Sequence, residues 1–334
     1  MNILSSTSTD LDGESLSVED LRAMRNEINR GDGIQLGVQH NPIFPPIGQL
    51  YNARLVEDSD GKTLLVADNF TYNESIVELD GEEYIVSTHE KSKRFAGIKR
   101  RSDFNSILLF DYLIFKTEKE KEIFEKELKE IHQELSLGRH IQKAAWNDPQ
   151  VIITLGQYFL FYKILKPIGK VLIRKVVEDL GEDFFQQYLK LKKLIIRSVK
   201  EFGSKDKPVI MVIQIPSENL EIELVHKVKF ENIEEYVYSL QPKMIQEVSQ
   251  KALHYEQIFD AEKVQFVLNE EGIWSLNYLL SKEGKIVGKP KYFNERNIVY
   301  KKILEQDQVG LSYSASKRKI EIKPTDIQSN ENRD

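Results

Sequence analysis

The segment covering residues 167–202 constrains the fold more than any other part of the chain, because its apolar residues recur at spacings of four and three. That spacing is the period of an α-helix with one apolar edge, and such an edge has to be covered by other protein. The residues of the edge are Ile168, Leu172, Val176, Leu180, Phe184, Tyr188, Leu191, Ile195, Val199 and Phe202. Acidic residues precede basic ones along the segment, which is the order that the helix dipole favours. The sequence therefore predicts one long amphipathic helix.

Two neighbouring segments extend this helical region over residues 102–205. Residues 151–165 are apolar, and we interpret them as a helix that ends at Lys166-Pro167, because proline lacks the amide hydrogen and clashes with the preceding turn. Residues 105–137 also predict a helix, although residues 107–115 are apolar enough to form a buried strand. The apolar stripe of that helix consists of Phe124, Leu128, Ile131 and Leu135. We expect this stripe and the long helix to pack against each other.

Residues 17–101 change to the two-residue period of β-strands after a short helix. Ser17 and Asp20 form an approximate capping box at the start of that helix. Strands are predicted at residues 34–39, 49–57, 62–70, 75–79 and 83–87. Turn sequences at residues 58–61 and at Asp80-Gly81 tolerate positive φ and separate the strands as hairpin turns do. The pattern favours a small antiparallel barrel or sandwich.

Residues 206–323 alternate between strands and one helix. The predicted order is strand 209–215, strand 221–230, helix 233–259, strand 263–268 and strand 273–280. Hairpin-type junctions indicate an antiparallel sheet with the helix on one face, and residues 285–287 and 319–323 add candidate edge strands.

With a disordered leader at residues 1–16 and a disordered tail at residues 324–334, the chain is expected to have an α+β fold. Its parts are a small antiparallel β-rich N-terminal domain, a central long-helix layer and a C-terminal antiparallel sheet with ββαββ order.

Composition excludes several classes of protein. The chain of 334 residues has a net charge of −6, which does not suit a general binder of polyanions. It contains no cysteine, so disulfide scaffolds, thiolate zinc sites, iron–sulfur clusters and cysteine nucleophiles are all excluded. The sequence has neither of the common glycine-rich phosphate-binding motifs, and no two of its six histidines are three or four residues apart. We therefore expect no cofactor and no metal site.

Targeting signals are also missing from the sequence. The first 16 residues are rich in Ser, Thr and acidic side chains, and they lack both a basic stretch and an apolar core. The longest apolar stretch, residues 151–162, is shorter than the ~20 residues that cross a bilayer. The expected location is the cytoplasm.

A catalytic histidine is the first of three candidate sites. Residues 37–42, followed by residues 46–48 and 53–55, resemble the strand around the catalytic histidine of phage prohead proteases. The resemblance implies a catalytic role for His40 and a partner serine in a Gly-Leu-Ser-type strand shortly downstream. Here Gly310-Leu311-Ser312 lies far away in another domain, and the resemblance covers too little of the chain to assign a family. The alternative is a histidine that holds the turn before a proline.

A metal-dependent nuclease is the second candidate. Asp307 followed by Glu321-Ile322-Lys323 resembles the Asp…Glu-x-Lys core of restriction-type nucleases. In such a core, two carboxylates hold a divalent ion and the lysine polarises the attacking water. The resemblance implies catalytic roles for Asp307, Glu321 and Lys323, whereas the ordinary alternation of an edge strand explains the same residues without catalysis.

The third candidate is a basic loop at residues 91–101. Its cations are Lys91, Lys93, Arg94, Lys99, Arg100 and Arg101, with Phe95 between them. Cations grip phosphates and an aromatic ring stacks on a base, so the loop is a candidate contact for nucleic acid. A solvated connection between the β-rich domain and the helices is the alternative.

These observations favour a non-enzymatic intracellular binding or adaptor protein that uses the basic loop and the long amphipathic helix. Residues 151–202 are the expected surface for a protein partner or for self-association. The alternatives are a metal-dependent nuclease or other hydrolase, and a peripheral membrane protein that docks through the same helices. Enzymatic activity is the less favoured interpretation, because the sequence contains no recognisable catalytic motif.

Overall fold

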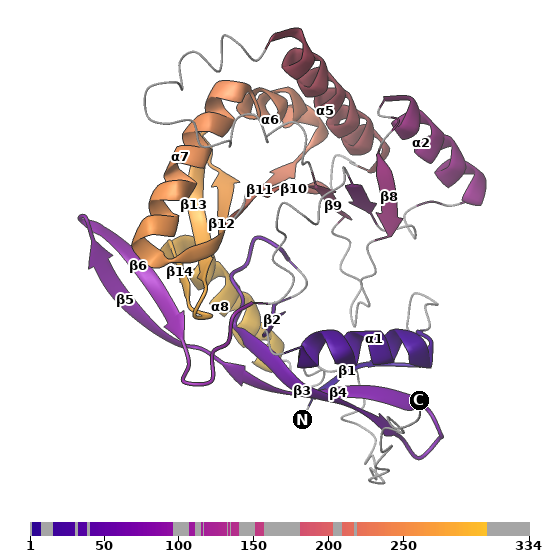
Figure 1. The fold of residues 1–334 in the computed structure, drawn as a ribbon, viewed down its shortest axis with the longest axis vertical. Coiled ribbons are helices and arrows are strands. Elements are labelled where there is room, and N and C mark those ends of the chain that lie inside the picture. The colour runs from indigo at the N-terminus through magenta and orange to yellow at the C-terminus, as the bar shows by residue number, and fades with distance from the viewer. Residues whose placement is uncertain are drawn as a thin grey trace, which may run out of the picture.

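A computed structural model of the chain contains two β-sheets and six α-helices in its described residues (Figure 1). The described residues are 2–7, 16–30, 33–38, 41–95, 107–110, 115, 117–131, 133, 135–139, 151–156, 181–202, 209–216 and 219–305. One sheet is antiparallel with four strands, and the other is mixed with ten strands. The structure therefore has the α+β class that the sequence predicts.

The four-stranded sheet confirms the expected β-rich N-terminal part. Its strands, in order, are β1 (Asn2–Ser6), β4 (Thr63–Thr71), β3 (Gly48–Glu57) and β2 (Ile34–Leu36). Helix α1 (Val18–Asn29) packs on β3 and β4 through Leu21 and Ile28. It begins at the predicted capping box, in which Ser17 Oγ accepts a hydrogen bond from the Asp20 amide and the Asp20 carboxylate accepts one from the Ser17 amide.

The expectation of a disordered leader is wrong for Asn2–Ser6, which forms β1 and pairs with β4. Leu4 packs against the core between α1 and the sheet. A short strand of this kind gains its order from burial and from pairing with a distant segment, and neither is visible in the leader itself.

The ten-stranded sheet takes its strands from widely separated parts of the chain. In order they are β5 (Asn73–Leu79), β6 (Glu82–Thr88), β14 (Ile286–Gly288), β13 (Trp274–Ser281), β12 (Ala261–Leu268), β11 (Glu221–Val228), β10 (Val209–Pro216), β9 (Val151–Gly156), β7 (Ile107–Phe110) and β8 (Ser136–Arg139). The sheet continues across the domain boundaries expected near residues 101 and 205, and these boundaries stay predictions.

Strands β5 and β6 belong to the ten-stranded sheet and not to an N-terminal barrel, which corrects the expected grouping. One residue, Tyr72, separates β4 from β5, and β6 pairs with β14. The predicted turn between β5 and β6 is confirmed, since Asp80 and Gly81 have φ angles of 54° and 77°. These are the left-handed conformations of a type I′ hairpin turn.

The predicted ββαββ order is confirmed as β10, β11, two helices, β12 and β13. The helix expected over residues 233–259 is divided into α6 (Ile233–Ser239) and α7 (Pro242–Phe259), because Pro242 cannot continue the preceding helix and suits the first turn of a new one. The helices carry the chain across the sheet, so β11 and β12 are parallel. This corrects the expectation of a purely antiparallel sheet. Strand β14, expected as an edge strand, lies between β13 and β6.

The middle of the chain contains strands as well as helices. Val151–Gly156 is strand β9, which corrects the helix expected over residues 151–165. A short apolar run does not distinguish a buried strand from a buried helix, and pairing with β10 decides here. Ile107–Phe110 is strand β7, the alternative that the apolar pattern left open, and α2 (Glu118–Ile131) follows it. Helix α8 (Pro290–Glu305) was not predicted.

Part of the predicted long helix is observed as α5 (Gly181–Phe202), and residues 167–180 of the predicted segment lie outside the described residues. Buried residues of its apolar edge include Leu191, Ile195 and Val199. The rings of Phe202 and of Phe124 in α2 contact each other edge to face, with centroids 4.9 Å apart. Figure 1 shows α5 and α2 side by side. The apolar edge of α5 is therefore covered by protein, as expected.

Different parts of the chain cover the two faces of the ten-stranded sheet. One face shares the largest core with α2, α5, α6 and α7. On the other face, Ile43 packs against Ile210, Val212, Val225 and Val267, and Phe293 of α8 packs against Tyr278 and Leu280. The second face is thus covered by α8 and by residues 41–46, which connect β2 to β3.

His226 of β11 predicts a pH dependence of folding. Its ring stacks on Tyr236 of α6, with ring centroids 5.4 Å apart, and burial lowers the pKa of His226 to about 4. Between pH 6.5 and pH 4 the unfolded chain takes up a proton that the folded chain excludes, so the free energy of unfolding falls as the pH falls. We expect a loss of about 2–3 kcal/mol over this range, measured by urea denaturation at several pH values.

The matched control is His254, which is exposed on α7. His226→Gln removes this part of the pH dependence, whereas His254→Gln leaves it in place. An unchanged pH profile in the His226 variant would contradict the prediction.

Candidate functional site

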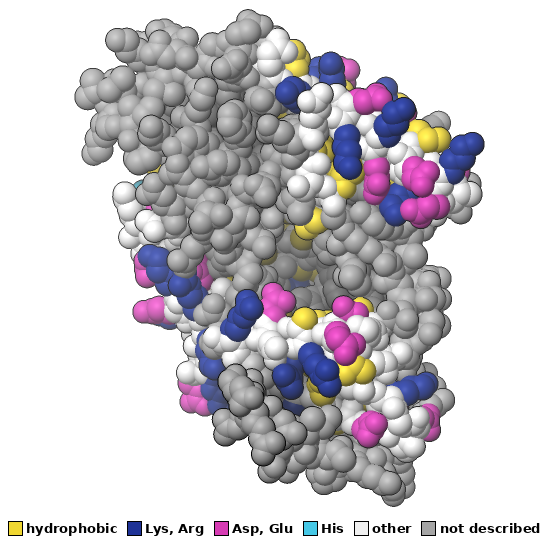
Figure 2. Space-filling view, turned by 45° about the vertical axis from the view of Figure 1, so that its right-hand side comes forward, with side chains coloured by type: hydrophobic (Ala, Val, Ile, Leu, Met, Phe, Trp, Pro, Cys, Tyr) yellow, Lys and Arg dark blue, Asp and Glu magenta, His cyan; other side chains and the backbone are white. Residues whose placement is uncertain are grey.

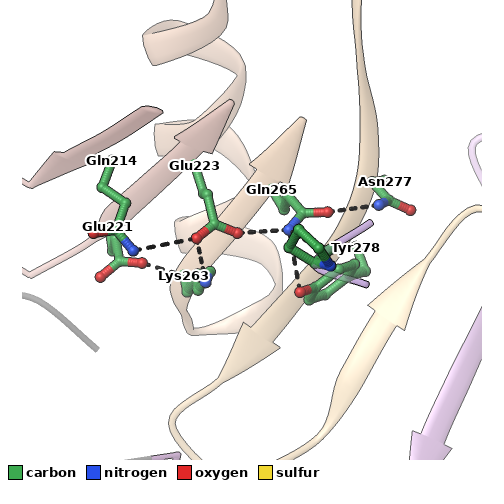
Figure 3. Close-up of polar contacts among 8 residues, drawn as sticks. Gln214, Glu221, Glu223, Lys263, Gln265, Asn277 and Tyr278 are labelled. Atoms are coloured by element: carbon green, nitrogen blue, oxygen red, sulfur yellow. Dashed lines mark hydrogen bonds and ion pairs between the residues drawn. The ribbon is translucent and has the colours of Figure 1, made fainter. Parts of the chain in front are cut away.

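Three buried charges lie together on neighbouring strands of the ten-stranded sheet (Figure 3). Glu221 and Glu223 belong to β11, and Lys263 belongs to β12. The parallel register pairs Glu221 with Lys263 and Glu223 with Gln265, so these side chains share the face that residues 41–46 cover. The Lys263 ammonium lies 2.8 Å from Glu223 Oε1 and 3.4 Å from Glu221 Oε1. We call Glu221, Glu223 and Lys263 the buried ionic cluster.

Attraction to the two carboxylates keeps the Lys263 side chain charged. Burial by itself lowers the pKa of Lys263, but Glu223 and Glu221 outweigh burial and raise that pKa above the ordinary lysine value. Glu223 also accepts hydrogen bonds from Gln265 Nε2 at 2.5 Å and from Gln214 Nε2 at 3.4 Å. Lys263 is therefore a fixed cation between two carboxylates and does not act as a base at neutral pH.

The same face of the sheet holds residues 41–46, which we call the strap. Gln265 Nε2 donates to the Pro42 carbonyl at 2.8 Å, and Asn277 Nδ2 donates to the Ile43 carbonyl at 2.6 Å. Because the three prolines of the strap have no N–H, it offers mainly carbonyl acceptors, and the side chains of the sheet supply the donors.

Arg296 of α8 anchors the other end of the strap. Its guanidinium donates to the carbonyls of Pro45 and Pro46 at 3.1 and 2.9 Å, and it also pairs with Glu74 of β5. The side chain is buried, and burial lowers the pKa of Arg296 although Glu74 opposes the shift. Arg296 thus connects the strap with the first strand of the ten-stranded sheet.

Gln265, Asn277 and Arg296 hold the backbone of the strap in place. Within the described ranges, no three His, Asp or Glu side chains are arranged to hold a metal ion. Glu221 and Glu223, which lie side by side on one strand, are engaged by the Lys263 ammonium. The chemical role of this arrangement is to fix the strap on the ten-stranded sheet, and this joins the two sheets.

Sequence reasoning missed the buried ionic cluster. Glu221, Glu223 and Lys263 alternate with apolar residues, which is typical of a strand with one solvated face. The sequence did contain one signal of a polar sheet face. Polar residues recur on three successive predicted strands, because Gln265 and Asn277 continue the pattern of Glu221, Glu223 and Lys263. The strap, from another part of the chain, turns that polar face inward.

Several predicted site residues lie outside the described part of the chain. They are His40, Lys99, Arg100, Arg101, Asp307, Glu321 and Lys323. The protease and nuclease interpretations therefore stay predictions, and so does membrane docking. Lys91 of the basic loop is described and exposed.

The rest of the described basic loop is held against the protein. Arg94 Nε lies 2.5 Å from Glu262 Oε2, and the backbone of Lys93 exchanges two hydrogen bonds with the Gln49 side chain. Phe95 is 2% exposed and packs in the core that α8 covers. Because its ring lies inside the protein, the expected stacking of Phe95 on a base does not fit this structure.

A surface of the opposite sign is formed by β5 and β6. Residues 73–88, which we call the acidic hairpin, contain no basic residue. Their acidic residues are Glu74, Glu78, Asp80, Glu82 and Glu83. All residues of β5 except Leu79 are exposed, and the hairpin lies at the outer border of the structure in Figure 1. By contrast, basic and acidic side chains are interspersed on the face that carries α1, α2 and α5 (Figure 2).

Comparison with known proteins identifies no relative. No protein-family model matches the chain, and no curated protein or solved structure matches it significantly. Among the described helices, none is long and apolar enough to cross a membrane.

The buried ionic cluster predicts an asymmetric response to substitution. Lys263→Met leaves two carboxylates buried without their cation, so we expect the free energy of unfolding to fall by about 3–5 kcal/mol. The triple variant Lys263→Met, Glu221→Gln and Glu223→Gln removes all three charges and recovers most of that loss. Urea denaturation followed by circular dichroism measures both effects.

Lys285→Met is the matched control, because Lys285 forms an exposed ion pair with Glu283 at 2.6 Å. For such a pair we expect a loss of only about 0–1 kcal/mol. Equal losses in the two lysine variants would show that Lys263 does not have the role described.

Proposed function

We propose that this chain is a non-enzymatic binding protein and that the acidic hairpin is its binding surface. The observation that carries the proposal is an exposed strand at the border of the ten-stranded sheet whose carboxylates are only partly balanced by cations. Surfaces of opposite charge attract and orient each other, so the partner is a positively charged segment of another protein.

Within the described residues, cations compensate two of the five acidic residues of the hairpin. Glu74 pairs with Arg296, and Glu82 pairs with Lys289 at 2.6 Å. The remaining acids form no ion pair within the part of the chain that the structure describes, and they are Glu78, Asp80 and Glu83. Glu78 and Glu83 lie directly opposite each other across the hairpin, where like charges repel. A cation supplied by a partner relieves this repulsion.

The surfaces expected from the sequence have less support than the acidic hairpin. The apolar edge of α5 lies in the core, so a partner reaches it only by opening the packing of α5 against α2. In the basic loop, Arg94 is paired with Glu262 and Phe95 is buried. The acidic hairpin is already exposed and needs no such rearrangement.

Charge reversal on the hairpin tests the proposal. We expect fluorescently labelled decalysine to bind the full chain in an anisotropy titration, with an affinity that falls as salt is added. The double variant Glu78→Lys and Glu83→Lys removes the uncompensated pair and is expected to weaken binding about tenfold or more.

The matched control is Glu270→Lys with Glu271→Lys, which makes the same charge change at exposed positions of the turn between β12 and β13. This control is expected to bind decalysine nearly as well as the original chain. If both double variants lose affinity equally, the binding reflects net charge and the hairpin is not the site.

A further inference from the structure

This inference rests on the proposed function and specifies how the partner is held. We infer that an extended, basic segment of another protein binds by adding a strand to the outer edge of β5. The backbone of β5 is regular, its outer edge has no described neighbour, and apolar and acidic side chains flank that edge.

The backbone of β5 is regular and paired on one side. It pairs with β6 along its whole length of seven residues, from Asn73 with Thr88 to Leu79 with Glu82, without a register shift. It is the first strand of the sheet, and no other described strand pairs with its outer side. Such an edge presents alternate N–H and C=O groups outward, and a second extended backbone can satisfy them.

Of the features that usually block pairing at a sheet edge, β5 has only charged side chains, Glu74 and Glu78. β5 contains no proline, no lysine and no β-bulge. The strand at the opposite end of the sheet, β8, has only four residues and includes Gly138. Of the two ends of the sheet, β5 is therefore the better template, and its own negative charge is what selects among partners.

The side chains of β5 define the chemistry of the partner. Ile76 is 69% exposed and Val77 is 38% exposed, and neighbouring residues of a strand point to opposite faces. Each face of the edge therefore carries an apolar side chain near its middle. Glu78 follows, with Glu83 opposite it on β6. The complementary strand has aliphatic residues at its centre and Lys or Arg beside this acidic pair.

The negative charge of β5 favours a basic peptide over other possible occupants of this edge. A second copy of β5 would bring two acidic edges together, and directly opposed like charges destabilise a strand pair. Nucleic acid is repelled by the same carboxylates, because its backbone is negative. A basic extended peptide matches both the sign of the charge and the length of the free edge.

The test measures binding of the full chain to three labelled forms of the peptide Lys-Lys-Val-Ile-Val-Lys-Lys. One form is unmodified, one carries N-methyl groups on all its backbone amides, and one carries single methyl groups on its lysine side-chain nitrogens, which keep their positive charge. Both edges of a strand pair through backbone N–H groups, so only the form with methylated backbone amides is unable to donate to β5. We expect that form to bind at least about tenfold more weakly and the other to retain its affinity.

The outcomes separate this inference from the function on which it rests. If the two methylated forms behave alike, in either direction, strand addition is wrong while charge-dependent binding stands. If neither the peptides nor decalysine bind, the proposed function itself is wrong. If sedimentation velocity shows self-association that Ile76→Lys abolishes, the edge is occupied by a second copy of the chain and the inference is overturned.

Discussion

The Lys263 ammonium group is what allows Glu221 and Glu223 to lie inside the ten-stranded sheet. Carboxylates buried there without a cation would lose their hydration and gain nothing in return, which destabilises a fold by several kcal/mol. Because these charges compensate one another, the strap and α8 can cover the second face of the sheet. Hydrogen bonds from Gln265 and Asn277 to the strap then join the two sheets.

Cations also determine the properties of the acidic hairpin. Arg296 holds Glu74, and Lys289 holds Glu82 while its ammonium lies 4.0 Å from the centroid of the Tyr84 ring. These contacts attach the hairpin to α8 and to Lys289, which lies between β14 and α8, whereas Glu78, Asp80 and Glu83 are exposed and form no ion pair within the described residues. An edge that is already ordered loses little conformational entropy when a partner docks, and this favours binding. The fold thus presents an ordered and exposed acidic edge.

Elements that depend on neighbouring residues were predicted well. The capping box at Ser17, the turn at Asp80-Gly81 and the apolar edge of α5 each involve residues within a few positions of one another. The errors concern pairing between distant segments. Residues 151–156 form a strand because β10 lies beside them, and Asn2–Ser6 form one because β4 does. The crossover through α6 and α7 likewise makes β11 and β12 parallel, although each strand looks the same from its own residues.

By itself the amino-acid sequence determined the α+β class, the ββαββ order and the concentration of negative charge in residues 73–88, because period, turn chemistry and charge belong to consecutive residues. Only the tertiary structure decided which polar strand face is covered and which strand ends the sheet. A glutamate that alternates with apolar residues has the same local pattern in β5 and in β11. In β11 the strap buries it and Lys263 pairs with it, whereas β5 has no described strand on its outer side and Glu78 stays exposed. That difference depends on segments far apart in the chain, so no window of sequence contains it.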